Sequence, residues 1–299
     1  MPERRRGPGR PAATDHGPGT RQGSRPASRQ GHPARPGARP STSWDRVAEW
    51  YLGWVGERGS KHHRQLAIPA VMDALALRPG EQVLDVGSGQ GVLARDVLDA
   101  RAEYTGVDAS ERLLAAGRST YGTRARFLAG DAAELVGGVG LAPASYDAVV
   151  FMLSLQDMEP LEAVIDSAAQ VLRDGGRLVI LMTHPAFRIP RQSGWGWDEG
   201  RKLRYRRVDA YCSRMTIPLS PVPGRTAVGR TFHRPLGAYV NALSESGLMV
   251  DRLDETPTYK VARTGPTAQA DNASNREIPL FLLLRAIKWY PPVRGEGGE

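Results

Sequence analysis

The stretch Val83-Leu84-Asp85-Val86-Gly87-Ser88-Gly89-Gln90-Gly91-Val92-Leu93-Ala94 decides the fold that we expect for this chain. It is an apolar run that ends at an acid and three alternating glycines, after which apolar residues return at helical spacing. Such a run is typical of a buried parallel strand, and the glycines permit a tight turn that a ligand can approach closely. The following helix directs its amide dipole at the turn, which favours carboxylates and other acceptor oxygens. The stretch therefore predicts strand, turn and helix, with a ligand site at the carboxyl end of the strand.

The same alternation of strand and helix continues along the chain. Six further strands are predicted at residues 104–108, 125–131, 145–151, 175–182, 248–253 and 278–286. Helices are predicted at 110–121, where Ser110 can act as the N-cap, at 160–172 and at 235–246. Strands that alternate with helices of this length indicate an α/β fold with a doubly wound parallel sheet.

Two segments depart from this alternation. Residues 44–80 carry apolar residues at helical spacing and predict two helices before the first strand, which we interpret as an N-terminal helical lid. Residues 184–230, after the fifth strand, are rich in aromatic and basic side chains, with prolines and glycines among them. Loops after strand ends often carry binding function, so we interpret this insertion as a substrate cover, with a dimer contact as the alternative. Residues 263–276 are polar and are expected to form a loop.

The net charge of +8 is concentrated at the N-terminus. Residues 1–43 hold nine arginines against Glu3 and Asp15, whereas the remaining residues hold 31 basic and 30 acidic side chains. Because residues 1–43 are rich in Arg, Pro and Gly and almost free of large apolar side chains, we expect a disordered tail, which is either dispensable or an electrostatic arm. The folded domain is expected over 44–290, with a flexible C-terminus at 291–299. Its near-neutral charge disfavours broad contact with nucleic-acid phosphates.

Cys212 is the only cysteine of the chain. An intramolecular disulfide and a multi-cysteine zinc site are therefore excluded, and adjacent His62 and His63 do not share a helical face, so we expect no metal site. No apolar run approaches the length of a membrane span, and the first residues lack the apolar core of a secretory signal. These features predict a cytoplasmic protein without membrane contact.

The spacing of the glycines discriminates between two nucleotide-type ligands. A dinucleotide-binding turn has the pattern Gly-x-Gly-x-x-Gly, with the pyrophosphate at the helix N-terminus. Here the third glycine comes one residue early, at Gly91, and Val92 occupies the expected position. Asp85, two residues before Gly87, is also poorly placed for a pyrophosphate. The spacing therefore disfavours a dinucleotide.

With three motifs further along the chain, the turn resembles the first motif of the class I S-adenosylmethionine-dependent methyltransferases. The resemblance covers roughly residues 44–286 and implies a Rossmann-like, seven-stranded, mostly parallel sheet with S-adenosylmethionine as cofactor. The matching positions are Asp85, Gly87, Gly89 and Gly91 in the first motif, Asp108 after the second strand, Gly130-Asp131-Ala132 after the third, and Tyr146-Asp147 with residues 152–157 at the fourth.

The resemblance implies a role for each of these positions. Asp108 would hold the ribose hydroxyls, Asp131 would accept the adenine amine, and Asp85 would act near the methionine amino group, either directly or by fixing the turn. Asp147 is expected to be structural, because it begins its strand. The full cofactor set is Asp85, Gly87, Ser88, Gly89, Gly91, Asp108, Ala109, Gly130, Asp131, Ala132 and Met152, with Tyr51 from the lid.

The implied activity is transfer of a methyl group to an O or N atom of a small-molecule acceptor by in-line displacement. Such a reaction needs alignment and exclusion of water, and a base only where the acceptor must lose a proton. The candidate bases are His184, His233, His63 and Asp157, although a hydrogen-bonded structural role is the alternative for each histidine.

The acceptor is expected to be planar or aromatic and to lie under Trp195, Trp197 and Tyr211. The Asn/Asp-Pro-Pro-Tyr/Phe motif typical of nucleic-acid amino methyltransferases is absent, since residues 151–156 read Phe-Met-Leu-Ser-Leu-Gln. Two alternatives remain open: an RNA methyltransferase or nucleic-acid-binding protein that uses the basic tail and insertion, and a cofactor-binding protein without activity. The chain is expected to be a monomer or a homodimer.

Overall fold

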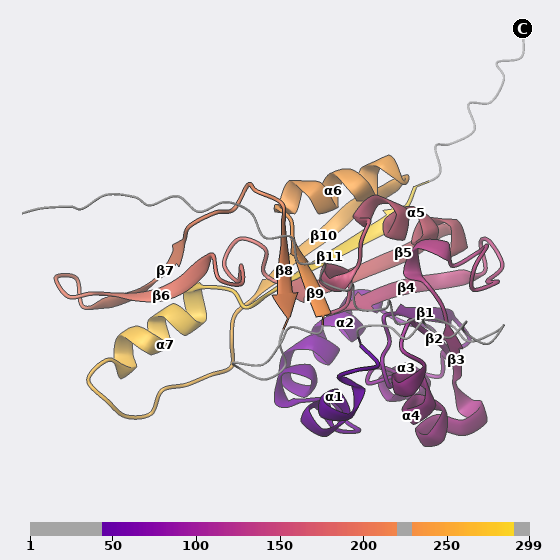
Figure 1. Cartoon of the computed structure of the whole chain (residues 1–299), viewed down its shortest axis with the longest axis horizontal. Helices are drawn as coiled ribbons and strands as arrows, with labels where there is room; N and C mark the ends of the chain where they lie inside the picture. Colours follow the sequence, from indigo (N-terminus) through magenta and orange to yellow (C-terminus); the bar gives the residue numbers. More distant parts are fainter. Residues whose placement is uncertain (1–43, 220–228, 290–299) are drawn as a thin grey trace, which may run out of the picture. The chain divides into compact units, whose positions relative to one another are not determined.

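The computed structural model describes residues 44–219 and 229–289, which contain a seven-stranded sheet with helices on both faces (Figure 1). The tail expected at 1–43 and the flexible terminus expected at 291–299 lie outside the described residues. The strand order is β10-β11-β5-β4-β1-β2-β3. The strands are β1 (Gln82–Val86), β2 (Glu103–Asp108), β3 (Arg126–Ala129), β4 (Tyr146–Met152), β5 (Leu172–Thr183), β10 (Leu248–Thr256) and β11 (Phe281–Lys288). Only β11 runs antiparallel to its neighbours in this sheet, so the predicted doubly wound, mostly parallel fold is confirmed.

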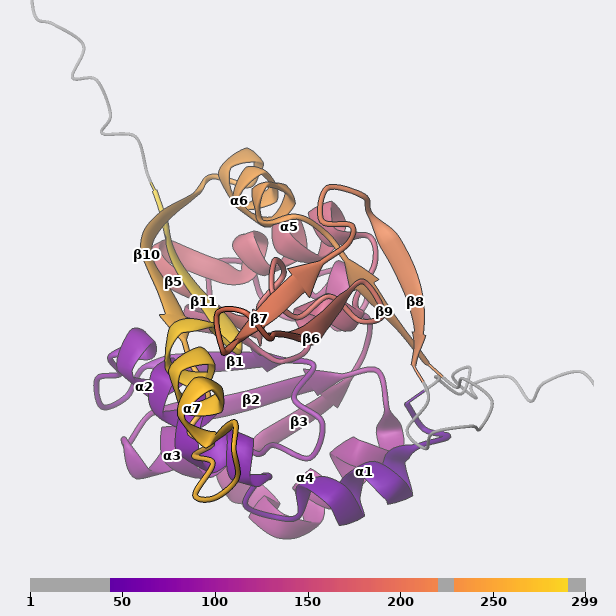
Figure 2. The same cartoon turned by 90° about the vertical axis from the view of Figure 1, so that its left-hand side faces the viewer.

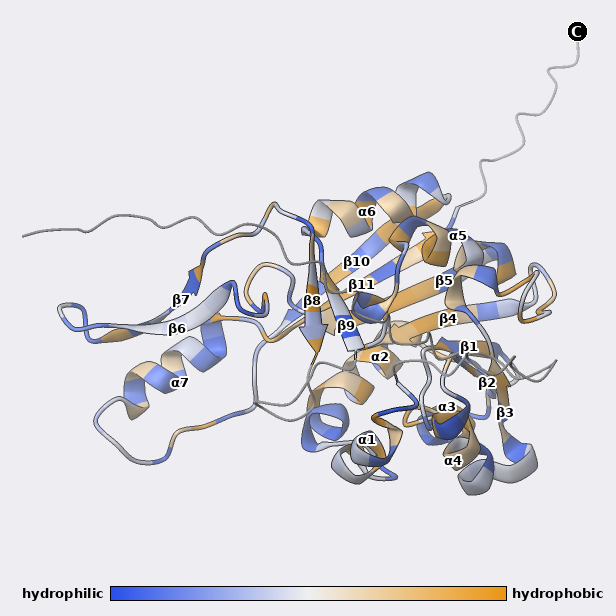
Figure 3. Ribbon diagram, viewed as in Figure 1, coloured by the Kyte–Doolittle hydropathy of each residue, from blue (hydrophilic) through white to orange (hydrophobic). Residues whose placement is uncertain are grey.

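The helices pack on the two faces because side chains alternate along each strand. Leu84 and Val86 belong to a core cluster with α5 and α6, whereas Val83 belongs to a second cluster with α2, α3 and α4. The central strands β4 and β5 are accordingly apolar along most of their length (Figure 3). The helices are α1 (Ala48–Val55), α2 (Ile68–Leu75), α3 (Ala94–Asp99), α4 (Glu111–Tyr121), α5 (Leu161–Val171), α6 (Leu236–Glu245) and α7 (Ala268–Glu277). Shorter turns are η1 (His63–Ala67), η2 (Gly122–Arg124), η3 (Ala132–Glu134) and η4 (Leu155–Asp157).

The predicted helices before β1 are present as α1, η1 and α2. The predicted cap of α4 is confirmed as well, because Oγ of Ser110 accepts a hydrogen bond of 3.3 Å from the backbone N–H of Leu113. Within residues 44–219 and 229–289, no helix is both long and apolar enough to cross a membrane.

The insertion after β5 forms two antiparallel hairpins (Figures 1 and 2). One pairs β6 (Ser193–Asp198) with β7 (Leu203–Val208), and the other pairs β8 (Met215–Leu219) with β9 (Gly229–His233). The loop expected at 263–276 is a wrong prediction, since most of that stretch lies in α7. Ser274 is the only fully buried residue of α7, so the helix has no apolar stripe from which its period could be recognised.

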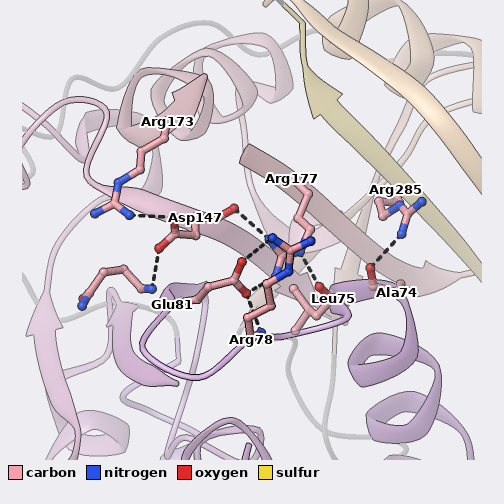
Figure 4. A network of polar contacts seen from close by, with 9 residues as sticks. Ala74, Leu75, Arg78, Glu81, Asp147, Arg173, Arg177 and Arg285 are labelled. Atoms are coloured by element: carbon pink, nitrogen blue, oxygen red, sulfur yellow. Dashed lines mark hydrogen bonds and ion pairs between the residues drawn. The ribbon is translucent and has the colours of Figure 1, made fainter. Parts of the chain in front are cut away.

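A network of charged groups joins the amino ends of β1, β4 and β5 (Figure 4). Asp147 accepts hydrogen bonds from the backbone N–H of Gln82 at 2.7 Å and from the guanidinium of Arg173 at 2.6 Å. Arg177 pairs with Glu81 and donates to the backbone oxygen of Asp147 at 3.4 Å. Asp147 therefore links two strands, in keeping with the structural role expected of it.

Candidate functional site

The glycine turn follows β1 and is shaped by positive φ angles. Gly87, Gly89 and Gly91 have φ values of 73°, 55° and 78°, which favour glycine. A Cβ atom on Gly87 would lie 2.5 Å from Cβ of Ser154, and one on Gly91 would lie 2.6 Å from Cζ of Phe127. At Gly89 the nearest atom would be 3.7 Å away. Packing therefore requires the outer two glycines, whereas the backbone at Gly89 has room beside it.

Asp108 connects this turn to the end of β2. Its Oδ2 accepts a hydrogen bond of 2.8 Å from the backbone N–H of Gly89, and its Oδ1 accepts one of 2.8 Å from the N–H of Ser110. Burial raises the pKa of Asp108, although both hydrogen bonds oppose the shift. The backbone N–H of Ala109 is a third donor to this carboxyl. Because a carboxylate can accept about four hydrogen bonds, Asp108 keeps capacity for a further hydroxyl donor.

Asp85 lies in β1 with its side chain directed at the neighbouring strand. It is buried and accepts a hydrogen bond of 2.7 Å from the hydroxyl of Tyr104, a residue that the sequence does not single out. Burial raises the pKa of Asp85 to about 7. Ser88 is buried too, and its Oγ would lie 2.6 Å from a Cβ on Gly106 of β2. The hydrogen bond from Tyr104 ties Asp85 to β2, and a role of Asp85 in fixing the turn stays a prediction.

The structure brings the third motif to the same edge of the sheet. The N–H of Gly130 donates to the backbone oxygen of Asp108 at 3.0 Å, because β2 and β3 are parallel neighbours. Asp131 is exposed and caps η3 by accepting from the N–H of Ala133 at 2.9 Å. Ala109 follows Asp108 directly and is exposed, and Ala132 begins η3. Five of the expected positions thus gather around the ends of β2 and β3.

Two further expected residues approach the turn from other elements. Met152 ends β4, and Ser154 just beyond it donates from its Oγ to the backbone oxygen of Val86 at 2.6 Å. Tyr51 of α1 is the residue nearest to the open side of Gly89. Burial and the charges of Asp108, Asp85 and Asp157 raise the pKa of Tyr51. Its hydroxyl therefore lies within electrostatic reach of three carboxyl groups.

The three candidate histidines are engaged in hydrogen bonds. His63 is buried, accepts from Ser60 through Nδ1 at 2.8 Å, and has a pKa lowered to about 4 by burial. Nδ1 of His184 accepts the N–H of Ala186 at 3.1 Å, so Nε2 carries the proton and donates to Glu255 at 2.8 Å. Burial lowers the pKa of His184 despite Glu255.

His233 ends β9 and donates from Nε2 to the backbone oxygen of Tyr211 at 2.8 Å. The hydroxyl of Tyr211 accepts the first N–H of α6, from Leu236, at 2.9 Å. Tyr211 lies in the segment between the two hairpins and thus links that segment to α6. Trp195 and Trp197 lie apart from it in sequence, on β6, where Trp197 is partly exposed and donates to Glu199 at 2.6 Å.

Asp157 occupies a different environment from the histidines. Burial raises its pKa to about 7, although a hydrogen bond from Thr231 and the charge of Arg234 oppose the shift. Arg234 is buried, donates to the backbone oxygen of Met158 at 2.6 Å and pairs with Glu159. Arg234 could not be singled out from the sequence, because an arginine before a helix is usually solvated. The only sequence feature that suggests its burial is its position next to Pro235 and two residues after Phe232. Hairpin β8–β9 therefore packs on η4, which contains Asp157.

Residues 83–176 match a family model described as a methyltransferase domain. A demethylmenaquinone methyltransferase of Beutenbergia cavernae is 37% identical over 111 residues, which are 37% of this chain and 44% of that protein. A ubiquinone biosynthesis O-methyltransferase of Xylella fastidiosa is 26% identical over 140 residues, which are 46% of this chain and 56% of that protein. The chain thus spans about half the length of the curated relatives it matches.

A solved structure is similar over a longer range. The S-adenosylmethionine-dependent methyltransferase of Mesorhizobium loti is 25% identical to this chain, with a TM-score of 0.59. The similarity covers 78% of this chain and all of that one. It therefore extends beyond the matched domain into the helices and strands on either side.

Proposed function

We propose that this chain, which contains a methyltransferase domain of the class I S-adenosylmethionine-dependent type, methylates a small molecule. The observation that carries the proposal is the hydrogen bond from Gly89 to Asp108, which holds a carboxylate beside an open glycine turn. Parallel strands bring these groups to the carboxyl edge of the sheet, where ligands of such folds bind.

The described residues fit S-adenosylmethionine in three places. The room beside Gly89 admits a ligand against the backbone, the spare acceptor capacity of Asp108 suits a ribose hydroxyl, and the exposed Asp131 suits the adenine amine. Met152 and Tyr51 supply apolar and aromatic contact from β4 and α1. When bound, the cofactor supplies an electrophilic methyl group on a positively charged sulfur.

The remaining tasks of the chain are alignment and proton removal. The acceptor atom must lie in line with the methyl–sulfur bond, so its position decides the rate. In our proposal, Tyr51 and hairpin β8–β9 restrict access of water, and the ionised Asp157 takes the proton that the acceptor loses. A carboxyl with a pKa of about 7 suits this role better than His184 or His63, whose Nδ1 atoms already accept hydrogen bonds.

The relatives support a small-molecule acceptor. Their names refer to methylation of demethylmenaquinone and to ubiquinone biosynthesis. We extend only the shared class to this chain, a small organic molecule; transfer to an O or N atom is our own prediction from the sequence. The near equality of basic and acidic side chains after residue 43 also favours a small acceptor over a nucleic acid.

The proposal is tested by isotope transfer. The full chain is incubated with S-adenosylmethionine labelled in its methyl group, together with a small-molecule extract or total RNA, and the products are analysed by mass spectrometry. We expect label in a small molecule with the wild type and about ten- to a hundredfold less with Asp108→Ala at limiting cofactor concentration. Label in RNA alone, or in neither pool, would contradict the proposal.

A further inference from the structure

A cavity of about 730 Å³ lies between β7, α7 and the segment 259–263. None of its lining residues belongs to the set assigned to S-adenosylmethionine. Its walls include two aromatic rings, those of Trp195 and Tyr259, and four cationic side chains. These cations are Lys61, Arg204, Lys260 and Arg263.

The positive charge of this cavity is poorly compensated. Asp271 is its only lining carboxylate, and it already accepts from Arg204 at 2.6 Å and from Thr267 at 3.0 Å. Lys61, Lys260 and Arg263 form no ion pair within residues 44–219 and 229–289. Three cations therefore share one cavity without a counter-charge from the described chain.

Two other cavities of the described chain lack this excess of positive over negative side chains. One of about 310 Å³ at the amino ends of β4 and β5 is lined by three cations and three carboxylates. Another of about 550 Å³ beside α3 is lined by four cations and three carboxylates. Only the cavity beside α7 combines four cations with a single carboxylate among these three.

Arginines also crowd around one wall. The guanidinium carbons of Arg188, Arg204 and Arg206 lie 5.3, 5.1 and 5.2 Å from the ring centre of Trp195. Burial and the charge of Arg206 lower the pKa of Arg188 to about 10. Of the three, only Arg204 lines the cavity, whereas Arg188 and Arg206 donate to the backbone oxygens of Pro279 and Phe187. An anion in the cavity would offset part of this positive charge, and the guanidinium fork of Arg204 matches the geometry of phosphate oxygens.

Helix α7 holds the cationic segment in place. The side chain of Asn272 accepts the N–H of Ala262 at 2.8 Å and donates to its oxygen at 2.9 Å. Asn275 donates to the backbone oxygen of Lys260 at 3.1 Å, and Ser274 donates to that of Arg204 at 2.5 Å. The backbones that carry these cations are therefore fixed before any ligand binds, which reduces the entropy lost on binding.

We propose that this cavity binds a phosphate-type group of a small molecule, one that carries two or more negative charges. A cavity lined by four cations and one carboxylate fits a compact polyanion, whereas a nucleic acid would require a basic track extending along the surface. The binding is independent of methyl transfer, so it can hold or fail whatever the activity of the chain.

The test is calorimetric titration of the full chain with inorganic pyrophosphate. The variant Lys260→Gln/Arg263→Gln removes two lining cations whose side chains make no ion pair in the described chain. The matched control, Arg58→Gln/Arg124→Gln, removes the same charge from the cavity beside α3. We expect binding to weaken at least about tenfold in the first variant, because each charge-assisted hydrogen bond contributes on the order of one such factor, and to persist in the control.

A second readout is the titration of His62 by NMR. Burial, together with Lys260 and Lys61, lowers the pKa of His62, and its ring lies 5.1 Å from that of Tyr259. Bound pyrophosphate should raise this pKa, because it offsets the charge of the two lysines. The proposal is overturned if the wild type does not bind pyrophosphate, if both variants weaken binding equally, or if His62 does not respond. It is also overturned if a single-stranded oligonucleotide binds at these residues and pyrophosphate does not.

Discussion

Asp157 and Asp85 are two carboxyls whose pKa burial raises to about 7, and their neighbours give them different roles. Asp85 is hydrogen-bonded to Tyr104 within the sheet, whereas Asp157 ends η4, which follows β4. We expect Asp157→Asn to lower kcat about a hundredfold, the usual scale for loss of a general base, and to abolish a rise of rate near neutral pH. Rates measured across pH, with S-adenosylhomocysteine binding as the control, would check this. An unchanged profile would exclude Asp157 as the base.

Asp85 should instead affect stability. Its pKa in the folded chain, about 7, lies above the ordinary value of 3.8, so the folded state holds the proton more tightly. The stabilisation of the fold by the protonated carboxyl of Asp85 is complete below the ordinary pKa of 3.8 and is lost as pH rises through about 7. We expect Asp85→Asn, which can still accept from Tyr104, to flatten the fall in Tm between about pH 5 and about pH 8. The exposed Asp131→Asn is the control, and an equal fall in both variants would contradict the assignment.

Gly87 and Gly89 have similar φ angles but different surroundings. A methyl group on Gly87 would meet Ser154 at 2.5 Å, whereas one on Gly89 would meet nothing within 3.7 Å. We expect Gly87→Ala to cost about 1–3 kcal/mol more unfolding free energy than Gly89→Ala, since both share the backbone strain. Chemical denaturation measures the difference. Equal losses would mean that the turn adjusts to the added group.

At the level of elements, helix α7 differs most from the sequence-based prediction, which was a loop. The helix nevertheless supports the neighbouring segment 259–263 through specific hydrogen bonds. Its polar asparagines hold the segment 259–263 instead of filling a core. We expect Asn272→Ala to cost about 1 kcal/mol for its lost hydrogen bonds and to increase amide exchange in residues 259–263. Hydrogen exchange followed by mass spectrometry would show this. Unchanged exchange in that segment would contradict the support role.

The elements that the sequence predicts are those that bury apolar side chains. β1, β4 and β5 lie between two helical layers and appear as apolar runs, so their existence and order could be derived. The hairpins of the insertion are partly exposed on both sides, and the pairing of β6 with β7 depends on residues without a regular period. Helix α7 could not be predicted for the same reason, because it has no regular pattern of apolar residues.

The candidate site likewise contains residues that could be predicted from the sequence and residues that could not. The resemblance to the methyltransferase motifs led to Asp108, Asp131 and the glycines, and the structure places them at one edge of the sheet, while their binding of the cofactor stays a prediction. The burial of Arg234 and the bond from Tyr104 to Asp85 could not, since both depend on how distant segments pack.

At the scale of the whole domain, parallel strand order explains why residues far apart in sequence share one edge. β4, β1, β2 and β3 are neighbours, so Met152, the glycine turn, Asp108 and Asp131 follow one another along the carboxyl edge. The insertion adds hairpin β8–β9 next to η4, and its strands β6 and β7 supply Trp195 and Arg204 to the cationic cavity beside α7. The residues proposed to bind the cofactor and those that line the cationic cavity are therefore separate sets.

The central claim is that Asp108 and the glycine turn bind S-adenosylmethionine, and calorimetry with S-adenosylhomocysteine tests it most directly. We expect the wild type to bind, Asp108→Ala to bind about ten- to a hundredfold more weakly through loss of charge-assisted hydrogen bonds, and the exposed Asp99→Ala to bind like the wild type. Absence of binding by the wild type, or undiminished binding by a folded Asp108→Ala, would contradict the claim.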